Sequence, residues 1–143
     1  MAKGFSLLEM VIVLGIIALI LGAAITFSGG ITGAAKEQAA EAKMREISAK
    51  LEAYSIGGGM YPSEEQGLQA LVERPTSPPE PKIWNQGFVS LPVDPWGGHF
   101  LYETPNPNEY RLSTKGPDGV RNTDDDIRYN PSLREDGWSY GRE

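Results

Sequence analysis

The chain has 143 residues, enough for one modest domain in addition to a hydrophobic helix. Its net charge of −6, without a stripe of basic residues, argues against a nucleic-acid partner. It contains no cysteine and one histidine, which excludes disulfides and disfavours a zinc site. The sequence has no cysteine nucleophile, no plausible Ser-His-Asp set and no phosphate-binding glycine loop, so it predicts a protein that is not an enzyme.

An uncharged apolar run covers residues 10–27. At about 1.5 Å per residue it would form a helix of roughly 27 Å, close to the roughly 30 Å of a hydrocarbon core. Glu9 stands at its front edge, and a carboxylate near the centre of a bilayer costs about 2.5–3.5 kcal/mol unless it has a partner. No other ionisable side chain lies within residues 5–34. The only complementary charge that the segment can offer is a new α-amine, made by cutting the chain after Gly4.

Three ordinary explanations fit this segment poorly. A secretory signal peptide is cut behind its apolar core, where residues 22–24 (Gly-Ala-Ala) match a cleavage site only weakly. A plain signal anchor accounts for the apolar run but leaves Glu9 without a role. A soluble core helix is rarely apolar on every face over such a length. The remaining interpretation is cleavage in front of the run, with the run retained in the mature protein.

Residues 4–9 read Gly-Phe-Ser-Leu-Leu-Glu, and this stretch resembles the class III signal of type IV pilins and pseudopilins, G-F-[ST]-L-x-E. The resemblance implies that a prepilin peptidase cuts between Gly4 and Phe5 and methylates the new amine of Phe5. Glu9 would then serve assembly by pairing, inside the membrane, with the Phe5 amine of a neighbouring subunit. An ordinary anchor or signal peptide is the alternative.

The expected organisation has three parts. Lys3 stays in the cytoplasm by the positive-inside tendency, so the chain beyond the apolar run is exported. We expect a leader peptide at residues 1–4 and a transmembrane or fibre-core helix at residues 5–33. Residues 34–143, called the head below, would include the amphipathic half of the helix.

A strong amphipathic helix is predicted over residues 34–55. Its apolar residues recur in steps of four and three. They are Ala40, Met44, Ile47, Leu51 and Tyr54. This stripe is expected to pack on the core of the head, with charged side chains on the other faces. Glycines within residues 29–33 predict a weak point or kink before it, and the Gly-Gly-Gly of residues 57–59 predicts its end.

The remainder of the head is expected to be mixed in structure. A capping-box pattern at residues 63–66 (Ser-Glu-Glu-Gln) opens a predicted short helix. Six prolines within residues 74–95 predict a long ordered loop. Its expected anchors are Trp84, Phe88, Leu91 and Trp96. A hairpin is predicted from strands at residues 99–102 and 110–113, whereas residues 128–143 carry no motif and are expected to be irregular.

Two further stretches narrow the resemblance. Residues 61–71 (Y-P-S-E-E-Q-G-L-Q-A-L) are similar to the Y-P-T-x-x-Q-G-L-x-A-L motif of the major pseudopilins of type II secretion systems. Residues 91–97 (L-P-V-D-P-W-G) are similar to their L-P-x-D-P-W-G. This resemblance implies the α+β, type IV pilin-like fold, in which a long N-terminal helix packs on a short helix and antiparallel strands. It also implies a structural subunit of a periplasmic pseudopilus that pushes folded proteins through the outer-membrane pore.

The same resemblance implies an inner-membrane protein with a single pass and its head in the periplasm. Its implied partners are further copies in a helical fibre, minor pseudopilins, the prepilin peptidase and the inner-membrane assembly platform, with a separate cytoplasmic ATPase as the motor. Two alternatives stay open. One is a type IV pilin of a surface fibre, and the other is a membrane-tethered, calcium-dependent binding domain that acts as a monomer.

Acidic residues gather in the segment that follows the predicted hairpin. Residues 124–126 are three consecutive aspartates and Asp118 precedes them, an arrangement of like charges that a cation would relieve. Oxygen ligands on a loop that contains glycine suit Ca²⁺, although a solvated acidic turn fits the residues equally well. The segment is not an EF-hand, since Thr123 stands where glycine is needed and Tyr129 where glutamate is needed.

Resemblance to the major pseudopilins, which bind one structural calcium in the corresponding loop, favours the metal. The ligands that it implies are the side chains of Asp118, Asp124, Asp125 and Asp126 and the main-chain oxygens of Leu112 and Val120. Asp118 and Asp124 are the strongest candidates among the side chains. The segment lacks the family's insert rich in glycine and glutamate and has a third consecutive aspartate. Which two of the three aspartates bind therefore stays open.

Overall fold

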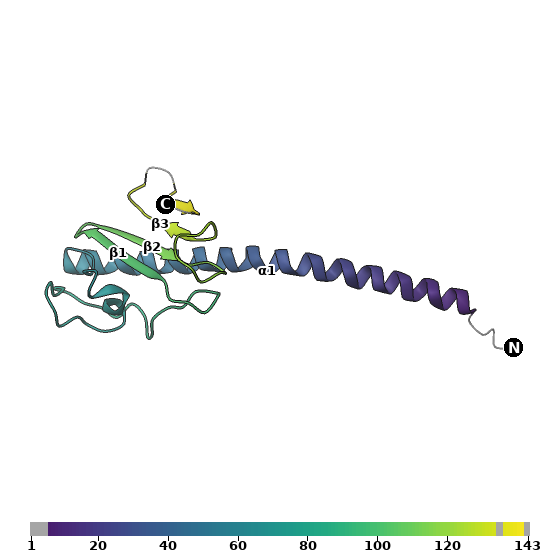
Figure 1. Cartoon of the computed structure of the whole chain (residues 1–143). Helices are drawn as coiled ribbons and strands as arrows, with labels where there is room; N and C mark the ends of the chain where they lie inside the picture. The colour runs from purple at the N-terminus through teal and green to yellow at the C-terminus, as the bar shows by residue number, and fades with distance from the viewer. Residues whose placement is uncertain (1–5, 134–135, 142–143) are drawn as a thin grey trace. The chain divides into compact units, whose positions relative to one another are not determined.

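The computed structural model of the chain describes residues 6–133 and 136–141, without the side chains of residues 21–31. Its elements are helix α1 (Leu7–Gly58), the 3-10 helix η1 (Gly67–Leu71) and strands β1 (Leu101–Asn106), β2 (Glu109–Thr114), β3 (Ile127–Tyr129) and β4 (Trp138–Tyr140) (Figure 1). The chain divides into two compact units, one up to Ala35 and one from Lys36 onward. The combination of one long helix with an antiparallel sheet confirms the predicted α+β fold.

Helix α1 is continuous from Leu7 to Gly58. The glycines within residues 29–33 therefore do not end it, because a glycine in a helix interior costs only about 1 kcal/mol. The predicted end is confirmed. Gly59 has a positive φ of 84°, a left-handed conformation that suits glycine after a helix, and its N–H donates to the carbonyl of Ser55 at 2.7 Å.

The core of the head forms against the predicted apolar stripe of α1. Ala40, Met44, Ile47 and Leu51 are 0% exposed and Tyr54 is 7% exposed. Residues of η1, β2 and β3 complete the cluster together with Phe100, which directly precedes β1, and β1 and β2 lie along this part of α1 in Figure 1. The Tyr110 hydroxyl shares a buried hydrogen bond of 2.6 Å with the hydroxyl of Ser48, which satisfies both polar groups inside the core.

The capping box that opens the short helix is present. The N–H of Ser63 donates to Gln66 Oε1 at 3.1 Å, and the N–H of Gln66 donates to Ser63 Oγ at 3.3 Å. The helix that follows is a 3-10 helix of 5 residues, and Gly67 at its start has a φ of +54°. This left-handed residue interrupts α-helical geometry directly after the capping turn, so the segment winds more tightly.

The long proline-rich loop is held to η1 by hydrogen bonds. Trp84 donates its indole N–H to the carbonyl of Ala70 at 2.8 Å, and the N–H groups of Gly87 and Phe88 both donate to the carbonyl of Leu71. Trp84, Phe88 and Trp96 pack against the core as predicted. The prediction was wrong for Leu91, which is 38% exposed, because the backbone hydrogen bonds and aromatic rings already hold the loop.

The four strands form one antiparallel sheet in the order β1-β2-β3-β4. The predicted hairpin is confirmed as β1 and β2, with Tyr102 opposite Leu112 and an irregularity between Glu103 and Asn106. Its first strand begins later than predicted. His99 is exposed and pairs with Val93 in an isolated bridge that closes the preceding turn.

The prediction of an irregular tail was wrong, because residues 127–129 and 138–140 form β3 and β4. Strands of three residues are too short to show an alternating pattern in sequence, and side-chain packing holds these two in place. The rings of Tyr129 and Trp138 lie 4.7 Å apart, and the Arg45 guanidinium lies 5.3 Å from the Trp138 ring. The Tyr140 hydroxyl donates to Glu41 Oε1 on α1 at 2.7 Å, so β4 is held against the helix.

Candidate functional site

The N-terminal part of α1 presents apolar side chains on every face. Each large apolar residue between Leu7 and Ile20 is exposed in the single chain, from 46% for Val13 to 83% for Leu7. Glu9 is exposed in the first turn of the helix, where a carboxylate interacts favourably with the helix dipole. A helix this apolar is stable only when lipid or other protein chains cover it.

The residues expected to be cut and methylated, Gly4 and Phe5, lie outside the described residues. Part of the predicted span of residues 5–33 also lies outside the described structure, since the side chains of residues 21–31 are not described. Within the portion of the chain that the structure does describe, no helix meets the length and hydropathy needed to cross a membrane.

The acidic segment forms the connection between β2 and β3, and residues 115–126 are called the acidic loop below. Its two ends meet where Thr114 and Ile127 pair across the sheet. The first turn of the loop depends on Gly116, which has a φ of +62° and lies against Asp125. A Cβ atom at this position would collide with the carbonyl oxygen of Asp125, so the two sides of the loop can approach only at a glycine.

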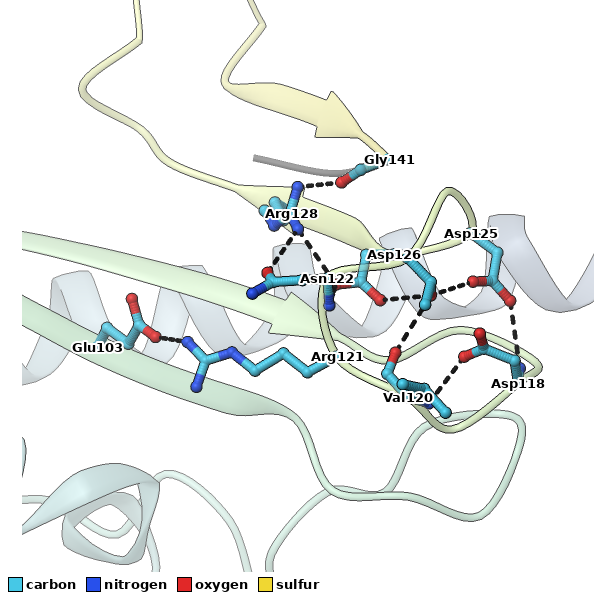
Figure 2. A network of polar contacts seen from close by, with 10 residues as sticks. Glu103, Asp118, Val120, Arg121, Asn122, Asp125, Asp126, Arg128 and Gly141 are labelled. Carbon is cyan, nitrogen blue, oxygen red and sulfur yellow. Dashed lines mark hydrogen bonds and ion pairs between the residues drawn. The ribbon is translucent and has the colours of Figure 1, made fainter.

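Asp118 and Asp125 face each other across the acidic loop (Figure 2). Asp125 Oδ2 accepts a hydrogen bond of 3.2 Å from the N–H of Asp118, and Asp118 Oδ1 accepts one of 2.7 Å from the N–H of Val120. Thr123 Oγ1 donates to Asp125 Oδ1 at 2.5 Å, and this bond lowers the pKa of the Asp125 carboxyl below its ordinary value. The charged form of Asp125 is therefore stabilised by donors of the loop itself.

Asp126 has a different environment from its two neighbours. It is 2% exposed, and its Oδ2 accepts from the N–H of Asn122 at 2.8 Å and from Arg128 Nη2 at 3.2 Å. Arg128 also donates to Asn122 Oδ1 and to the carbonyl of Gly141, which ties the acidic loop to the residue after β4 (Figure 2). Asp126 is thus neutralised by a cation of the chain itself.

The structure brings some of the predicted ligands together and separates others. Asp118 and Asp125 meet across the acidic loop, while Asp124 is exposed and Asp126 forms an ion pair with Arg128. Leu112 lies in the middle of β2, and the Val120 carbonyl accepts a hydrogen bond of 3.2 Å from Thr123 Oγ1. Among the residues described, no three acidic or histidine side chains gather closely enough to hold a metal ion by themselves. A cation would need main-chain oxygens as further ligands.

Sequence reasoning missed Arg128, Arg121 and Asn122. Arg128 stands two residues after Asp126 at the start of a strand, where alternate residues share a face, so this spacing was a usable signal. Arg121 forms an ion pair with Glu103 of β1, and nothing in its sequence position indicates this pairing. Asn122 has a φ of +65°, a left-handed conformation that asparagine tolerates better than most residues.

Comparisons with known proteins agree on one family. The family model described as type II secretion system (T2SS), protein G, matches residues 29–130. A second model, the prokaryotic N-terminal methylation motif, matches residues 1–25.

Relatives and a solved structure extend the match over most of the chain. The type II secretion system core protein G of Dickeya chrysanthemi is 36% identical over 128 residues, covering 87% of this chain and 84% of that protein. Its counterpart from Pseudomonas aeruginosa is 35% identical, covering 87% of this chain and 92% of that protein. The crystal structure of the major pseudopilin from the type 2 secretion system of enterohaemorrhagic Escherichia coli is 37% identical, with a TM-score of 0.62 over 69% of this chain and 86% of that chain.

Proposed function

The chain belongs to the protein G family of type II secretion systems, the major pseudopilins, and from this premise we propose how its parts serve assembly. Members of this family are structural subunits of the pseudopilus, and the chain is such a subunit and not an enzyme. The two other roles that the sequence left open, a pilin of a surface fibre and a monomeric tethered binding domain, are not favoured by these matches.

The observation that carries the proposal is the uncovered apolar surface at the start of α1. Side chains from Leu7 to Ile20 are exposed on all faces of the helix, and Glu9 is the one carboxylate among them. We propose that lipid covers this segment before assembly and that the same segments of other copies cover it afterwards. Contacts of one copy with the next along an axis are heterologous, and such contacts generate an open helical fibre.

Charge neutralisation would set the register of this packing. The match to the N-terminal methylation motif supports cleavage between Gly4 and Phe5, which creates an α-amine four residues before Glu9. Protonated at neutral pH, the amine of one copy would pair with Glu9 of its neighbour. An unpaired carboxylate in the membrane interior is costly, so a copy that enters out of register is disfavoured.

The methylation motif and the family together suggest the parts of the chain, its location and its partners. The leader would occupy residues 1–4, the membrane or fibre-core helix residues 5–33, and the head residues 34–143. The head would face the periplasm, and the fibre would push folded proteins through the outer-membrane pore. The prepilin peptidase, minor pseudopilins and the inner-membrane assembly platform are the proposed partners.

Replacement of Glu9 tests the assembly proposal. Glu9→Ala and the isosteric Glu9→Gln are expressed as full chains in host cells, beside Glu37→Gln, which changes an exposed carboxylate further along α1. We expect both Glu9 variants to be processed at Phe5 but to fail to cross-link into fibres, while Glu37→Gln assembles normally. Fibres of Glu9→Gln at the level of the unchanged chain would refute charge pairing.

We further propose that the acidic loop binds one structural Ca²⁺. Asp118 and Asp125 carry the proposal, because they meet across the loop and the carboxylates of both are hydrogen-bond acceptors. Asp124 and the main-chain oxygens of Leu112 and Val120 would contribute further oxygens toward the six to eight that Ca²⁺ takes. Of the four aspartates, Asp126 is the weakest candidate, since Arg128 and the N–H of Asn122 already occupy its Oδ2. The bound ion would supply only charge neutralisation and rigidity.

Thermal unfolding of the full chain in detergent, with calcium or with a chelator, tests the metal. We expect calcium to raise Tm and Asp118→Asn or Asp125→Asn to abolish that rise, because each change removes a charged ligand. Glu65→Gln, an exposed carboxylate in the capping turn, is the control and should keep the rise. If the chelator does not change the Tm of the unchanged chain, the proposed Ca²⁺ site is refuted.

A further inference from the structure

Asp94 is a buried carboxylate in the L-P-V-D-P-W-G stretch, and the assembly function does not account for it. It is 5% exposed. Its Oδ1 accepts hydrogen bonds from the N–H groups of Trp96 at 3.0 Å and Gly98 at 2.7 Å. A Cβ atom at Gly98 would lie 2.9 Å from Asp94 Oδ2, so the turn closes tightly around this carboxylate. A buried carboxyl group is unfavourable unless it is hydrogen-bonded, so its burial here indicates that it serves a specific contact.

That contact is with Thr114, the last residue of β2. The Thr114 hydroxyl donates to Asp94 Oδ2 at 2.7 Å, and Thr114 is 0% exposed. Thr114 pairs with Ile127 across the sheet. The acidic loop leaves the sheet after Thr114 and returns to it at Ile127. The hydrogen bond therefore fixes the base of the loop to a turn that lies 20 residues away in sequence.

Beyond this bond the turn and the acidic loop are separated by a cavity of about 510 Å³. Trp96 and His99 line it from the side of the turn, and residues from Lys115 to Gly119 line it from the side of the loop. Because the two walls face each other across open space, the bond between Asp94 and Thr114, together with the pairing of Leu101 with Ser113, sets the start of the loop relative to the turn.

We infer that Asp94 is a positioning residue for the acidic loop: by holding Thr114, it keeps Asp118 and Asp125 facing each other across the loop. The inference that Asp94 orders the loop depends on these contacts alone. The inference that Asp94 also raises the affinity for Ca²⁺ rests, in addition, on the proposed Ca²⁺ site.

The test removes the Thr114 hydroxyl and leaves all carboxylates in place. Thr114→Val keeps the shape of the side chain without the donor, and Thr114→Ser restores the donor. Ser48→Ala removes a comparable buried hydroxyl, which bonds Tyr110 and not a residue of the acidic loop. Amide hydrogen exchange is measured on the full chains in detergent without calcium, at the N–H groups of Asp118, Val120 and Asn122. The N–H of Gly87, bonded to Leu71 far from the loop, is the reference.

We expect Thr114→Val to speed exchange at the three loop amides about tenfold relative to Gly87, the effect of one lost hydrogen bond to a charged group. Thr114→Ser should exchange like the unchanged chain. Ser48→Ala should alter the loop and Gly87 alike. Loop exchange in Thr114→Val that matches the unchanged chain would overturn the inference.

Titration with calcium chloride separates this inference from the proposed metal site. If the site exists, Thr114→Val should raise the Kd for Ca²⁺ by about the same factor, and Thr114→Ser should restore it. Failure of the unchanged chain to bind Ca²⁺ would remove the metal, while faster loop exchange in Thr114→Val would still support the role of Asp94. Tight binding that is equal in Thr114→Val and the unchanged chain would contradict positioning of the ligands.

Discussion

At the scale of single residues, the three consecutive aspartates have separate roles. Asp125 faces Asp118 across the acidic loop, whereas Asp126 is buried against Arg128. A buried carboxylate is costly unless a cation and hydrogen bonds compensate it, and Arg128 and the N–H of Asn122 provide both. The arginine therefore holds one end of the loop by its own charge, whether or not a metal holds the other.

The first prediction concerns Arg128→Ala, which leaves Asp126 buried without its cation. We expect the free energy of unfolding to fall by about 3–5 kcal/mol, the usual cost of breaking a buried ion pair. Denaturant unfolding of the full chain in detergent measures it. Arg111→Ala is the control, since Arg111 is 48% exposed and its contact with Glu109 is 3.6 Å long, so a loss of about 0–1 kcal/mol is expected. Equal losses in the two variants would show that Asp126 does not depend on Arg128.

The second prediction concerns alkaline pH. Burial raises the pKa of Tyr102 to about 12, from 10.0 for a free tyrosine, and the pKa of the buried Tyr110 is also raised. The folded state therefore favours the neutral phenol. The stability that these groups contribute is complete below pH 10 and is lost as pH rises through 12.

We accordingly expect the free energy of unfolding to fall steeply between pH 10 and 12, and to fall less steeply in Tyr102→Phe, which has no proton to lose. Urea unfolding at a series of pH values measures both slopes. Parallel curves for the two chains across this range would contradict the assignment to Tyr102.

At the scale of elements, α1 combines two kinds of surface in one continuous helix. Up to Ile20 its large apolar residues are exposed, and from Ala40 to Tyr54 a narrow stripe is buried in the core of the head. Both were predictable, because the period of apolar residues along a helix is a local property of the sequence. The capping box at residues 63–66 was predictable for the same reason.

Other elements depend on contacts between residues that are distant in sequence, so the local sequence pattern could not predict them. Strand β4 is held by Trp138 against Arg45 and by Tyr140 against Glu41, both far away in sequence. The 3-10 geometry of η1 depends on the left-handed conformation of Gly67, which its residue type permits but does not demand. In the acidic loop the composition indicated a cation site, and the structure shows that one of the aspartates, Asp126, is paired with Arg128 instead.

The third prediction tests the buried stripe of α1. Leu51→Ala should lower the free energy of unfolding by about 2–5 kcal/mol, since Leu51 is 0% exposed and its removal leaves a cavity in the core. Ile56→Ala is a matched control on the same helix, because Ile56 is 86% exposed, and a change within about 0.5 kcal/mol is expected. Denaturant unfolding measures both. If Leu51→Ala lowers the free energy of unfolding as little as Ile56→Ala, Leu51 does not belong to the core.

At the scale of the whole molecule, the two compact units serve different needs of a pseudopilus subunit. The unit up to Ala35 has no core of its own among its described residues and must be covered by lipid or by other copies. The unit from Lys36 onward buries its own core and is held by hydrogen bonds and ion pairs at the acidic loop. In the proposed assembly the unit from Lys36 onward can therefore stay folded while only the N-terminal contacts change.

The most direct test of this account is the mass of the N-terminal peptide of the protein recovered from cell membranes. We predict that it begins at Phe5, with a methylated amine, and that it retains the apolar residues that follow. A protein that still begins at Met1, or one that has lost residues 5–33, would have no new amine to pair with Glu9 in the helix. Either result would contradict assembly by charge pairing.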